Sequence, residues 1–454
     1  MTSIATTLAA LAGGSSSAES LIEQARERAQ RASELNALAH VDWDGALADA
    51  RDCDARVKTG GALRALHGIP ITIKDLFNVR GMPTRAGTRA PLAELDDGEA
   101  LLVARLREAG AVIFAKTNMH EIALGATGEN RWTGDVKNPF DPARQSGGSS
   151  SGAGVAVATG IGLAGIGSDT GGSVRIPAAF CGVTGFKPTY GAIPLDGGLY
   201  LSWTCDHAGP LARSVDDCAR LFEVMAQCSA AHAAPGRAAR FAVPARWLRG
   251  RLQPAVREHF ERLTARLREA GAEVVEVATP RLPGASACYT TIVRAEAAWV
   301  HREALAGGGE GFSDLVLPAL QAGLQLSAAD YIGAMKQRDG VRAELDAILA
   351  GFDALLLPST GALPPPRGQT EVQLEDGPMS VRDAVLGQTL PFSMCGLPAL
   401  SIPVGLVEGS YGAGTPALPA GLQLVGRFGD DAALLGVGRW VEAQVGETIS
   451  PPGY

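Results

Sequence analysis

At 454 residues the chain is long enough to bury a large core, and 46% hydrophobic with 19% charged residues is typical of a soluble globular protein. Its net charge of −8 argues against a nucleic-acid partner held by bulk electrostatics. The seven cysteines are odd in number and have no CxxC spacing, which predicts no disulfide framework and no metal site, and favours a cytoplasmic location.

The first quarter of the chain shows helix and strand patterns in turn. The apolar run Ile4–Ala12 has no basic residue before it, so it predicts the first turns of a helix rather than a signal peptide. Ser16–Glu19 has the pattern of a capping box and opens an amphipathic helix. Asp44–Val57 predicts a second helix. Ile69–Lys74 predicts a short β-branched strand with a lysine at its end.

A unit of helix, glycine and strand occurs three times further along the chain. Each unit has a periodic helical stretch, one glycine and a short apolar strand: 98–109, Gly110 and 111–115; 256–270, Gly271 and 273–277; 328–350, Gly351 and 353–357. Alternation of this kind predicts an α/β protein with a large mixed, mostly parallel sheet flanked by helices on both faces. The most apolar long stretch, 155–167, is short and interrupted by glycine, so no membrane span is expected.

No clean domain boundary interrupts these elements, and we predict one domain over residues 1–454. Ala230–Arg240, rich in alanine, glycine, proline and arginine, is the best candidate for a linker. The segment 230–350 is mostly helical and is predicted to form a lobe or cap within the domain. Pro358–Gln369 contains three consecutive prolines and predicts a loop.

The segment 144–191 is rich in serine and glycine, and two short motifs in it are misleading. Gly160–Gly165 matches GxGxxG, but a dinucleotide site needs an acidic residue about 20 positions later, where Phe186 and Lys187 stand. Gly148–Gly152 matches the GxSxG nucleophile elbow, which needs an acid and then a histidine downstream. Because His301 is the last histidine of the chain, this second interpretation places the base poorly.

A third pattern in this segment is the turn Asp169–Ser173, in which two glycines precede a serine. Such a turn can direct successive N–H groups into one space, as an oxyanion hole requires, and Ser173 beside it could attack. A tight structural turn is the simpler alternative. A serine also needs a base, and Lys74 is the best placed of only six lysines, although a strand-end lysine is more often a surface residue. Spacing alone leaves these alternatives open.

Ordered blocks along most of the chain resemble the amidase signature family. The least similar part is 230–340. The matching blocks are 68–75 (GIPITIKD), 116–121 (KTNMHE), 147–152 (GGSSSG), 167–177 (GSDTGGSVRIP), 181–188 (CGVTGFKP), 209–214 (GPLARS), 396–403 (GLPALSIP) and 421–426 (GLQLVG).

This resemblance implies a catalytic triad of serine, cis-serine and lysine. By motif position Ser173 is the nucleophile, Lys74 the base and Ser149 the bridging residue between them. The spacings from Lys74 to Ser149 and from Ser149 to Ser173 agree with the family's arrangement. Ser150 and Ser151 are the competitors for the bridging role.

The resemblance also assigns roles around the triad. Asp169 and Arg175 are expected to brace the loop. The oxyanion hole is expected to consist of backbone N–H groups of Thr170, Gly171, Gly172 and Ser173.

The substrate pocket is less defined by the sequence. The resemblance places Ala123, Leu124 and Gly125 in the acyl pocket, where small residues suggest room. Ile176 stands where the malonamidase pattern has an arginine, which argues against a dicarboxylate monoamide. Trp299 and Tyr331 could wall the entrance, although aromatic residues on helices are more often core.

The function implied is an amidohydrolase with no cofactor, which cleaves C–N bonds of small or aryl amides, anilides or carbamates through an acyl-enzyme. The resemblance also suggests a homodimer. The alternative is the A-type subunit of a glutamine-dependent aminoacyl-tRNA amidotransferase, which would need a partner protein.

Overall fold

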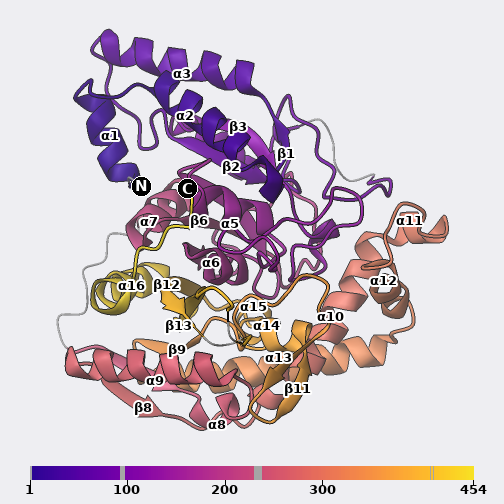
Figure 1. Cartoon of the computed structure of the whole chain (residues 1–454). Helices are drawn as coiled ribbons and strands as arrows, with labels where there is room; N and C mark the ends of the chain where they lie inside the picture. Colours follow the sequence, from indigo (N-terminus) through magenta and orange to yellow (C-terminus); the bar gives the residue numbers. More distant parts are fainter. Residues whose placement is uncertain (1–2, 93–97, 230–237, 409–410, 413) are drawn as a thin grey trace.

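The computed structural model describes residues 3–92, 98–229, 238–408, 411–412 and 414–454, and these residues build one large β-sheet with helices packed around it (Figure 1). Most of the candidate linker Ala230–Arg240 falls in 230–237, outside the described residues. The predicted loop Pro358–Gln369 begins at the last residue of a strand and is otherwise irregular.

The sheet has eleven strands within the described ranges. From one edge to the other they are β1 (Leu38–Val41), β3 (Val112–Thr117), β2 (Pro70–Lys74), β4 (Ala164–Asp169), β6 (His207–Ala212), β5 (Thr184–Lys187), β12 (Ala399–Val407), β13 (Leu418–Val425), β9 (Ala354–Pro358), β7 (Arg240–Val243) and β8 (Glu273–Glu276). A separate hairpin pairs β10 (Glu371–Leu374) with β11 (Gly377–Ser380).

The predicted mixed sheet flanked by helices is confirmed, but its parallel pairs are fewer than the sequence suggests. The pairs β3–β2, β2–β4, β9–β7 and β7–β8 are parallel, and they lie toward the two ends of the sheet. The central pairs from β4 to β9 are antiparallel. The cause is local connection: β12 and β13 pair as one hairpin, and β5 reaches β6 without a crossover helix.

The helices of the described chain include those expected from the sequence. They are α1 (Ile4–Ala12), α2 (Ala18–Arg31), α3 (Trp43–Lys58), α4 (Leu101–Glu108), α5 (Ser151–Ala158), α6 (Arg175–Cys181), α7 (Val215–Ala226), α8 (Ala245–Leu248), α9 (Pro254–Glu269), α10 (Ala285–Val300), α11 (Arg302–Ala306), α12 (Leu317–Gly323), α13 (Ala328–Leu349), α14 (Val381–Leu386), α15 (Leu390–Met394) and α16 (Asp431–Val445), with 3₁₀ turns η1 (Ser33–Leu35), η2 (Glu121–Ala123) and η3 (Leu282–Gly284). Within the described ranges, every helix is too short or too polar to cross a bilayer.

The predicted capping box of α2 is present but begins one residue later than expected. Ser17 is the N-cap, and its side chain accepts a hydrogen bond from the Ser20 backbone N–H. The Ser20 hydroxyl in turn accepts from the Ser17 N–H. A serine therefore takes the place expected for Glu19, because a hydroxyl can close the same reciprocal pair.

Strand β3 shows why both faces of the sheet are covered. Its side chains alternate between faces: Val112 and Phe114 join one hydrophobic cluster, whereas Ile113 joins the other. The first cluster includes residues of α2, α3 and α5, and the second includes residues of α4 and α7. A strand buried on both faces has a continuous apolar sequence, as β3 does.

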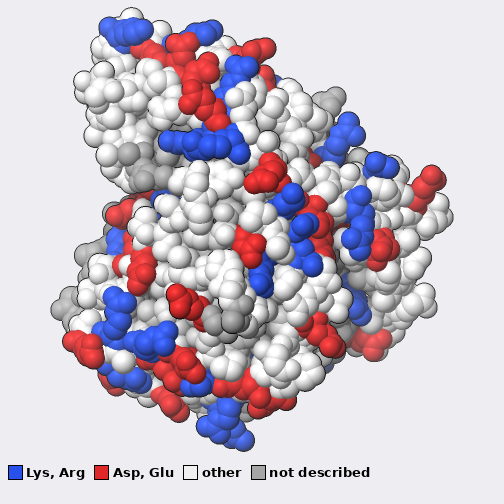
Figure 2. Space-filling model, in the orientation of Figure 1, with Lys and Arg blue, Asp and Glu red and all other residues white. Residues whose placement is uncertain are grey.

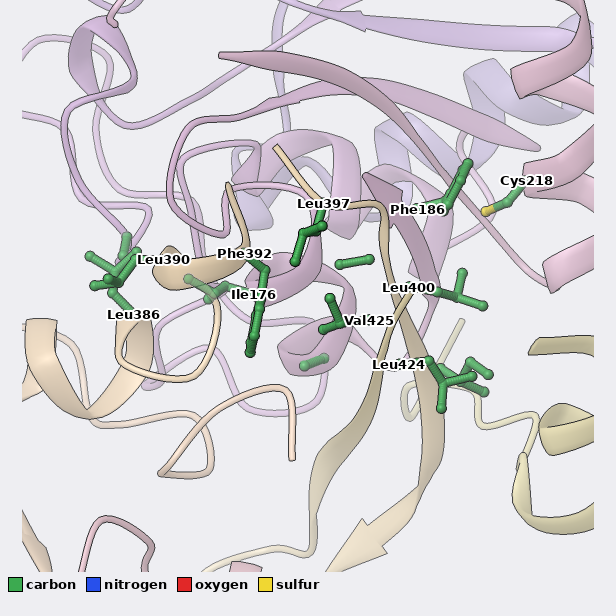
Figure 3. Close-up of a cluster of buried hydrophobic side chains, with 14 of the residues drawn as sticks. Ile176, Phe186, Cys218, Leu386, Leu390, Phe392, Leu397, Leu400, Leu424 and Val425 are labelled. Carbon is green, nitrogen blue, oxygen red and sulfur yellow. The ribbon is translucent and has the colours of Figure 1, made fainter. Parts of the chain in front are cut away.

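The middle of the sheet is covered by the cluster drawn in Figure 3. It includes Ile176 of α6, Phe392 of α15, Leu400 of β12 and Leu424 of β13, all fully buried. Because Ile176 lies three residues after Ser173, this cluster anchors the helix that follows the glycine turn.

The segment 230–350 contributes more than helices. Its described part carries β7 and β8 of the main sheet, together with α8 to α13. Helix α10 packs on both α12 and α13, and α11 and α12 project at one side of the molecule (Figure 1). The single domain over 1–454 and the lobe at 230–350 stay predictions.

On the face shown in Figure 2, acidic and basic side chains are interspersed.

Candidate active site

Lys74 lies at the end of a strand that is buried on all sides. Strand β2 runs parallel between β3 and β4, and each of its five residues is buried. The Lys74 ammonium nitrogen Nζ donates hydrogen bonds to Ser149 Oγ at 2.7 Å and to Ser168 Oγ at 2.8 Å. Burial lowers the pKa of Lys74 to about 7, against the smaller opposing effects of Asp169 and Asp206. A large fraction of this lysine is therefore neutral near physiological pH.

Ser149 is the serine of the GGSSSG block that contacts this lysine. The peptide bond between Gly148 and Ser149 is cis, as the resemblance implies. The Ser149 carbonyl accepts from the His120 N–H at 3.1 Å. Ser150 has a different environment, because its Oγ bonds to the backbone N and O of Ser168 at 3.2 and 3.1 Å. Ser151 Oγ makes only a 3.5 Å contact with the Ser149 carbonyl.

The small residues of α5 allow this block to lie deep in the protein. A Cβ on Gly152 would collide with the backbone oxygens of Ala37 and Asn118. The Gly152 N–H instead donates to the Asn118 carbonyl at 3.0 Å. Helix α5, which begins at Ser151, is thereby fixed against the end of β3.

Ser173 is adjacent to the Ser149 segment, but its hydroxyl is free. The Ser150 N–H donates to the Ser173 carbonyl at 3.2 Å, which joins the two segments. Ser173 is 4% exposed, and among the described residues its hydroxyl has no hydrogen-bond partner. The structure therefore brings Lys74 and Ser149 together, while the hydroxyls of Ser149 and Ser173 are not hydrogen-bonded to each other.

The predicted oxyanion loop presents unpaired donors. No acceptor within the described chain binds the backbone N–H groups of Thr170, Gly171, Gly172 or Ser173. Gly172 has φ 147°, and a Cβ there would collide with Thr389. Because buried backbone N–H groups are almost always paired in folded proteins, a run of unpaired ones is typical of an anion-binding nest.

Asp169 and Arg175, on either side of this loop, form a fully buried ion pair. Arg175 Nη2 and Nε donate to the two Asp169 carboxylate oxygens at 2.9 and 3.0 Å. The Val174 N–H and the Ser393 hydroxyl also donate to this carboxylate. Burial alone would raise the pKa of Asp169, but the paired guanidinium holds it well below its usual range. These contacts join Asp169 to Val174 and Arg175, and so hold the two ends of the loop 170–174 together.

Replacing Arg175 by methionine is expected to destabilise the protein by about 3–5 kcal/mol, because it leaves the buried Asp169 carboxylate without its cation. Equilibrium unfolding in denaturant measures this change. The exposed pair Arg51–Glu19, with a similar N–O distance of 2.7 Å, provides the control. Arg51→Met is expected to change stability by about 0.5 kcal/mol or less. A loss below about 1 kcal/mol for Arg175→Met would contradict the bracing role.

The predicted acyl-pocket segment Ala123–Gly125 follows a strained turn. The β-branched Ile122 has φ 44° and Ala123 has φ 63°, a region that favours glycine. The Ile122 N–H, bonded to the Ala86 carbonyl at 2.8 Å, helps to hold this turn. The space beside Gly125 is not empty, because a Cβ there would collide with the imidazole of His120.

A narrow, largely apolar pocket opens beside the oxyanion loop. Most of its lining residues are aliphatic or aromatic: Leu76, Phe77, Ala123, Leu195, Leu199, Tyr200 and Leu201. The rest of the lining is Ser168, Thr170, Asp206 and the backbone of Gly198. Ala123 thus lies at a pocket, as the resemblance implies, whereas Leu124 and Gly125 are not among its lining residues.

Four residues near the site were missed by the sequence reasoning. Ser168 contacts Lys74, and its place at the end of β4, next to β2, was a usable signal. Asp206 accepts from the Thr170 hydroxyl at 2.6 Å, and burial raises its pKa to about 6. Tyr289 of α10 lies against Gly171, where a Cβ would collide with its hydroxyl. His120 lies between Ser149 and Gly125. For Asp206, His120 and Tyr289, no pattern in the sequence indicated a place in the site.

The two aromatic residues considered for the entrance differ from each other. Trp299 is 61% exposed and stacks with Arg302. The Tyr331 hydroxyl donates to Glu296 at 2.7 Å, and Glu296 also accepts from Ser202.

In the part of the chain that the structure describes, no group of three or more His, Cys, Asp or Glu side chains is arranged to hold a metal ion.

Comparisons with known proteins agree with this geometry. A family model described as Amidase matches residues 20–435. A curated relative, the A-type subunit of glutamyl-tRNA(Gln) amidotransferase from Anaeromyxobacter sp. (strain K), is 34% identical, with 98% of this chain and 96% of that protein covered.

Two solved structures are also similar. One, described as an amidase, is 49% identical with a TM-score of 0.94, covering 98% of this chain and all of the other. The A-type subunit of glutamyl-tRNA(Gln) amidotransferase from Thermotoga maritima is 29% identical with a TM-score of 0.74, covering 94% of this chain and 92% of the other.

Proposed function

This chain belongs to the amidase family, and we propose that it is a free-standing amidohydrolase that cleaves small or aryl amides, anilides or carbamates through an acyl-enzyme on Ser173. The observation that carries this proposal is the buried Lys74 Nζ, 2.7 Å from Ser149 Oγ, beside a loop of unpaired N–H groups. A partly neutral lysine, a hydroxyl and an anion-binding nest are the parts that serine acylation needs.

In the proposed acylation step, Ser173 Oγ attacks the carbonyl carbon of the substrate. The Ser173 proton passes to Ser149 Oγ, and the Ser149 proton passes to the neutral amine of Lys74. Rotation of the free Ser173 hydroxyl toward Ser149 completes this relay. The negative charge that develops on the carbonyl oxygen is stabilised by the N–H groups of residues 170–173, each of which contributes about 3 kcal/mol in comparable sites.

Breakdown of the tetrahedral intermediate breaks the C–N bond. Ser149 gives its proton to the departing amine and regains one from Lys74. Water then attacks the carbonyl carbon of the Ser173 ester and gives a proton through Ser149 to Lys74. When the bond to Ser173 Oγ breaks, that proton returns through Ser149 to Ser173, so the acid is released and the hydroxyl is restored.

The lining of the narrow pocket supports a small apolar or aryl substrate. Leucine side chains dominate it, with Phe77 and Tyr200 beside them, and Ile176 is fully buried rather than presented to a ligand. Such a pocket favours apolar groups over charged ones.

The experiment that tests this function is a panel of p-nitroanilides, esters, primary amides and carbamates, assayed with the purified chain alone. We expect hydrolysis of at least one anilide or carbamate without any partner protein, because the proposed residues all come from one chain. Activity that appears only with partner subunits, glutamine and aminoacyl-tRNA would contradict the proposal.

That outcome would instead support the second candidate, an A-type amidotransferase subunit. It is favoured by the 34% identity to the Anaeromyxobacter protein over nearly the whole chain. The closer superposition on the amidase, with a TM-score of 0.94 against 0.74, favours the free hydrolase. The homodimer and the cytoplasmic location stay predictions.

A further inference from the structure

His120 occupies an unusual place at the edge of the proposed site. Its backbone N–H is bonded to the Ser149 carbonyl at 3.1 Å, and its ring fills the space beside Gly125. The residue is buried, and its ring is close enough to Lys74 for that charge to act on it. The mechanism proposed above does not use this imidazole.

The ring is neutral under ordinary conditions. Burial, with a further contribution from Lys74, lowers the pKa of His120 to about 4. A neutral imidazole carries one N–H and one lone pair, so the partner of one ring nitrogen decides the role of the other.

The hydrogen bonds of Thr127 decide which nitrogen carries the proton. Thr127 Oγ1 lies 3.3 Å from His120 Nδ1 and 3.3 Å from the carboxylate oxygen Oε2 of Glu129. A carboxylate can only accept, so the single hydroxyl hydrogen of Thr127 goes to Glu129. Thr127 then accepts from Nδ1–H, and the lone pair of His120 lies on Nε2.

That Nε2 atom is available to a ligand. Within the described chain Nε2 has no hydrogen-bond partner, and protein atoms do not enclose it fully. The inferred tautomer and the unpaired Nε2 atom together place a hydrogen-bond acceptor beside Gly125.

We infer that His120 is a specificity residue whose Nε2 accepts a hydrogen bond from the acyl part of the substrate. This inference rests on the proposed function and deepens it. The favoured substrates would be amides whose acyl group carries an O–H or N–H close to the carbonyl, such as hydroxyacyl, carbamoyl or ureido compounds. A substrate without that donor leaves the buried acceptor unpaired, which costs affinity in the transition state.

The test uses two p-nitroanilides of equal size, those of hydroxyacetic acid and propionic acid, which differ by a hydroxyl in place of a methyl group. We expect kcat/KM of the wild type to favour the hydroxyacetyl compound about tenfold. His120→Leu should bring this ratio close to one. His120→Gln should restore part of it, because its side-chain oxygen can accept. His259→Gln, on α9, is the control and should keep the wild-type ratio.

Nitrogen-15 NMR of histidine-labelled protein tests the tautomer independently of activity. The His120 signals are assigned by their loss in His120→Gln, and we expect a protonated Nδ1 and an unprotonated Nε2. A protonated Nε2, a wild-type ratio near one, or an unchanged ratio in His120→Leu would each overturn the inference. If neither anilide is hydrolysed, the proposed function fails, and the NMR result alone decides the tautomer on which this inference depends.

Discussion

Ser173→Ala is expected to lower kcat/KM for an activated anilide by about 10⁴-fold or more, because it removes the hydroxyl that attacks the substrate carbonyl. The same change should leave stability almost unaltered, since the Ser173 hydroxyl has no hydrogen-bond partner among the described residues. Steady-state kinetics and denaturant unfolding of the same preparation measure the two effects together.

Two neighbouring serines separate this result from general damage to the segment. Ser149→Ala should also lose most activity, because it removes the hydroxyl that contacts Lys74 at 2.7 Å. Ser151→Ala, which loses only a 3.5 Å contact, is expected to stay within about threefold of the wild type. A fully active Ser173→Ala, or a Ser151→Ala as inactive as Ser149→Ala, would show that the nucleophile or the bridging serine is misassigned.

Lys74→Met is the second substitution with a large expected effect, a loss of about 10³-fold or more in kcat/KM. The base must be neutral to accept a proton, and burial places the pKa of Lys74 at about 7. Activity should therefore rise with pH through about 7 and level off above it. In Lys74→Met the residual activity should lose this rise. The pH profile of kcat/KM, measured from about pH 5 to 9, gives both results.

Lys187→Met is the matched control for this pH profile. Lys187 is also fully buried, burial also lowers its pKa to about 7, and its Nζ donates to the Pro188 carbonyl rather than to a serine. The Lys187 variant is expected to keep the rise near pH 7. If the rise were lost with Lys187→Met and kept with Lys74→Met, Lys74 would not be the base.

Local patterns in the sequence predicted individual elements well. The helix–glycine–strand units were found because a 3.6-residue period, a glycine and an apolar run are all local signals. Gly110 and Gly271 adopt φ of 91° and 94° between the helix and the strand, as such a signal requires. The start of α2 was misplaced by one residue, because Ser16 and Ser17 are both competent caps.

The arrangement of the sheet could not be predicted in the same way. Strand order and direction depend on contacts far apart in the chain, such as β5 pairing with β12. A buried strand in an antiparallel pair has the same continuous apolar pattern as one in a parallel pair. The sequence therefore indicated a sheet covered on both faces without revealing its antiparallel centre.

For the site, local chemistry alone gave a serine beside a glycine turn, with Lys74 as a candidate base that spacing could not decide. The resemblance supplied Lys74 and Ser149, whose side chains the structure places 2.7 Å apart. Ser168 and His120 lie in matching blocks, but the resemblance assigned neither of them a role, and Asp206 lies outside every block. Only the folded chain places them against Lys74, Thr170 and Gly125.

The most direct test of this account is to trap the acyl-enzyme and locate it. The protein is incubated with an activated p-nitrophenyl carbamate, digested, and mapped by tandem mass spectrometry. We predict a carbamoyl group on Ser173 in the wild type, and none in Ser173→Ala. A label on Ser149 or Ser150, or equal labelling of the Ser173→Ala variant, would contradict the assignment of Ser173 as the nucleophile.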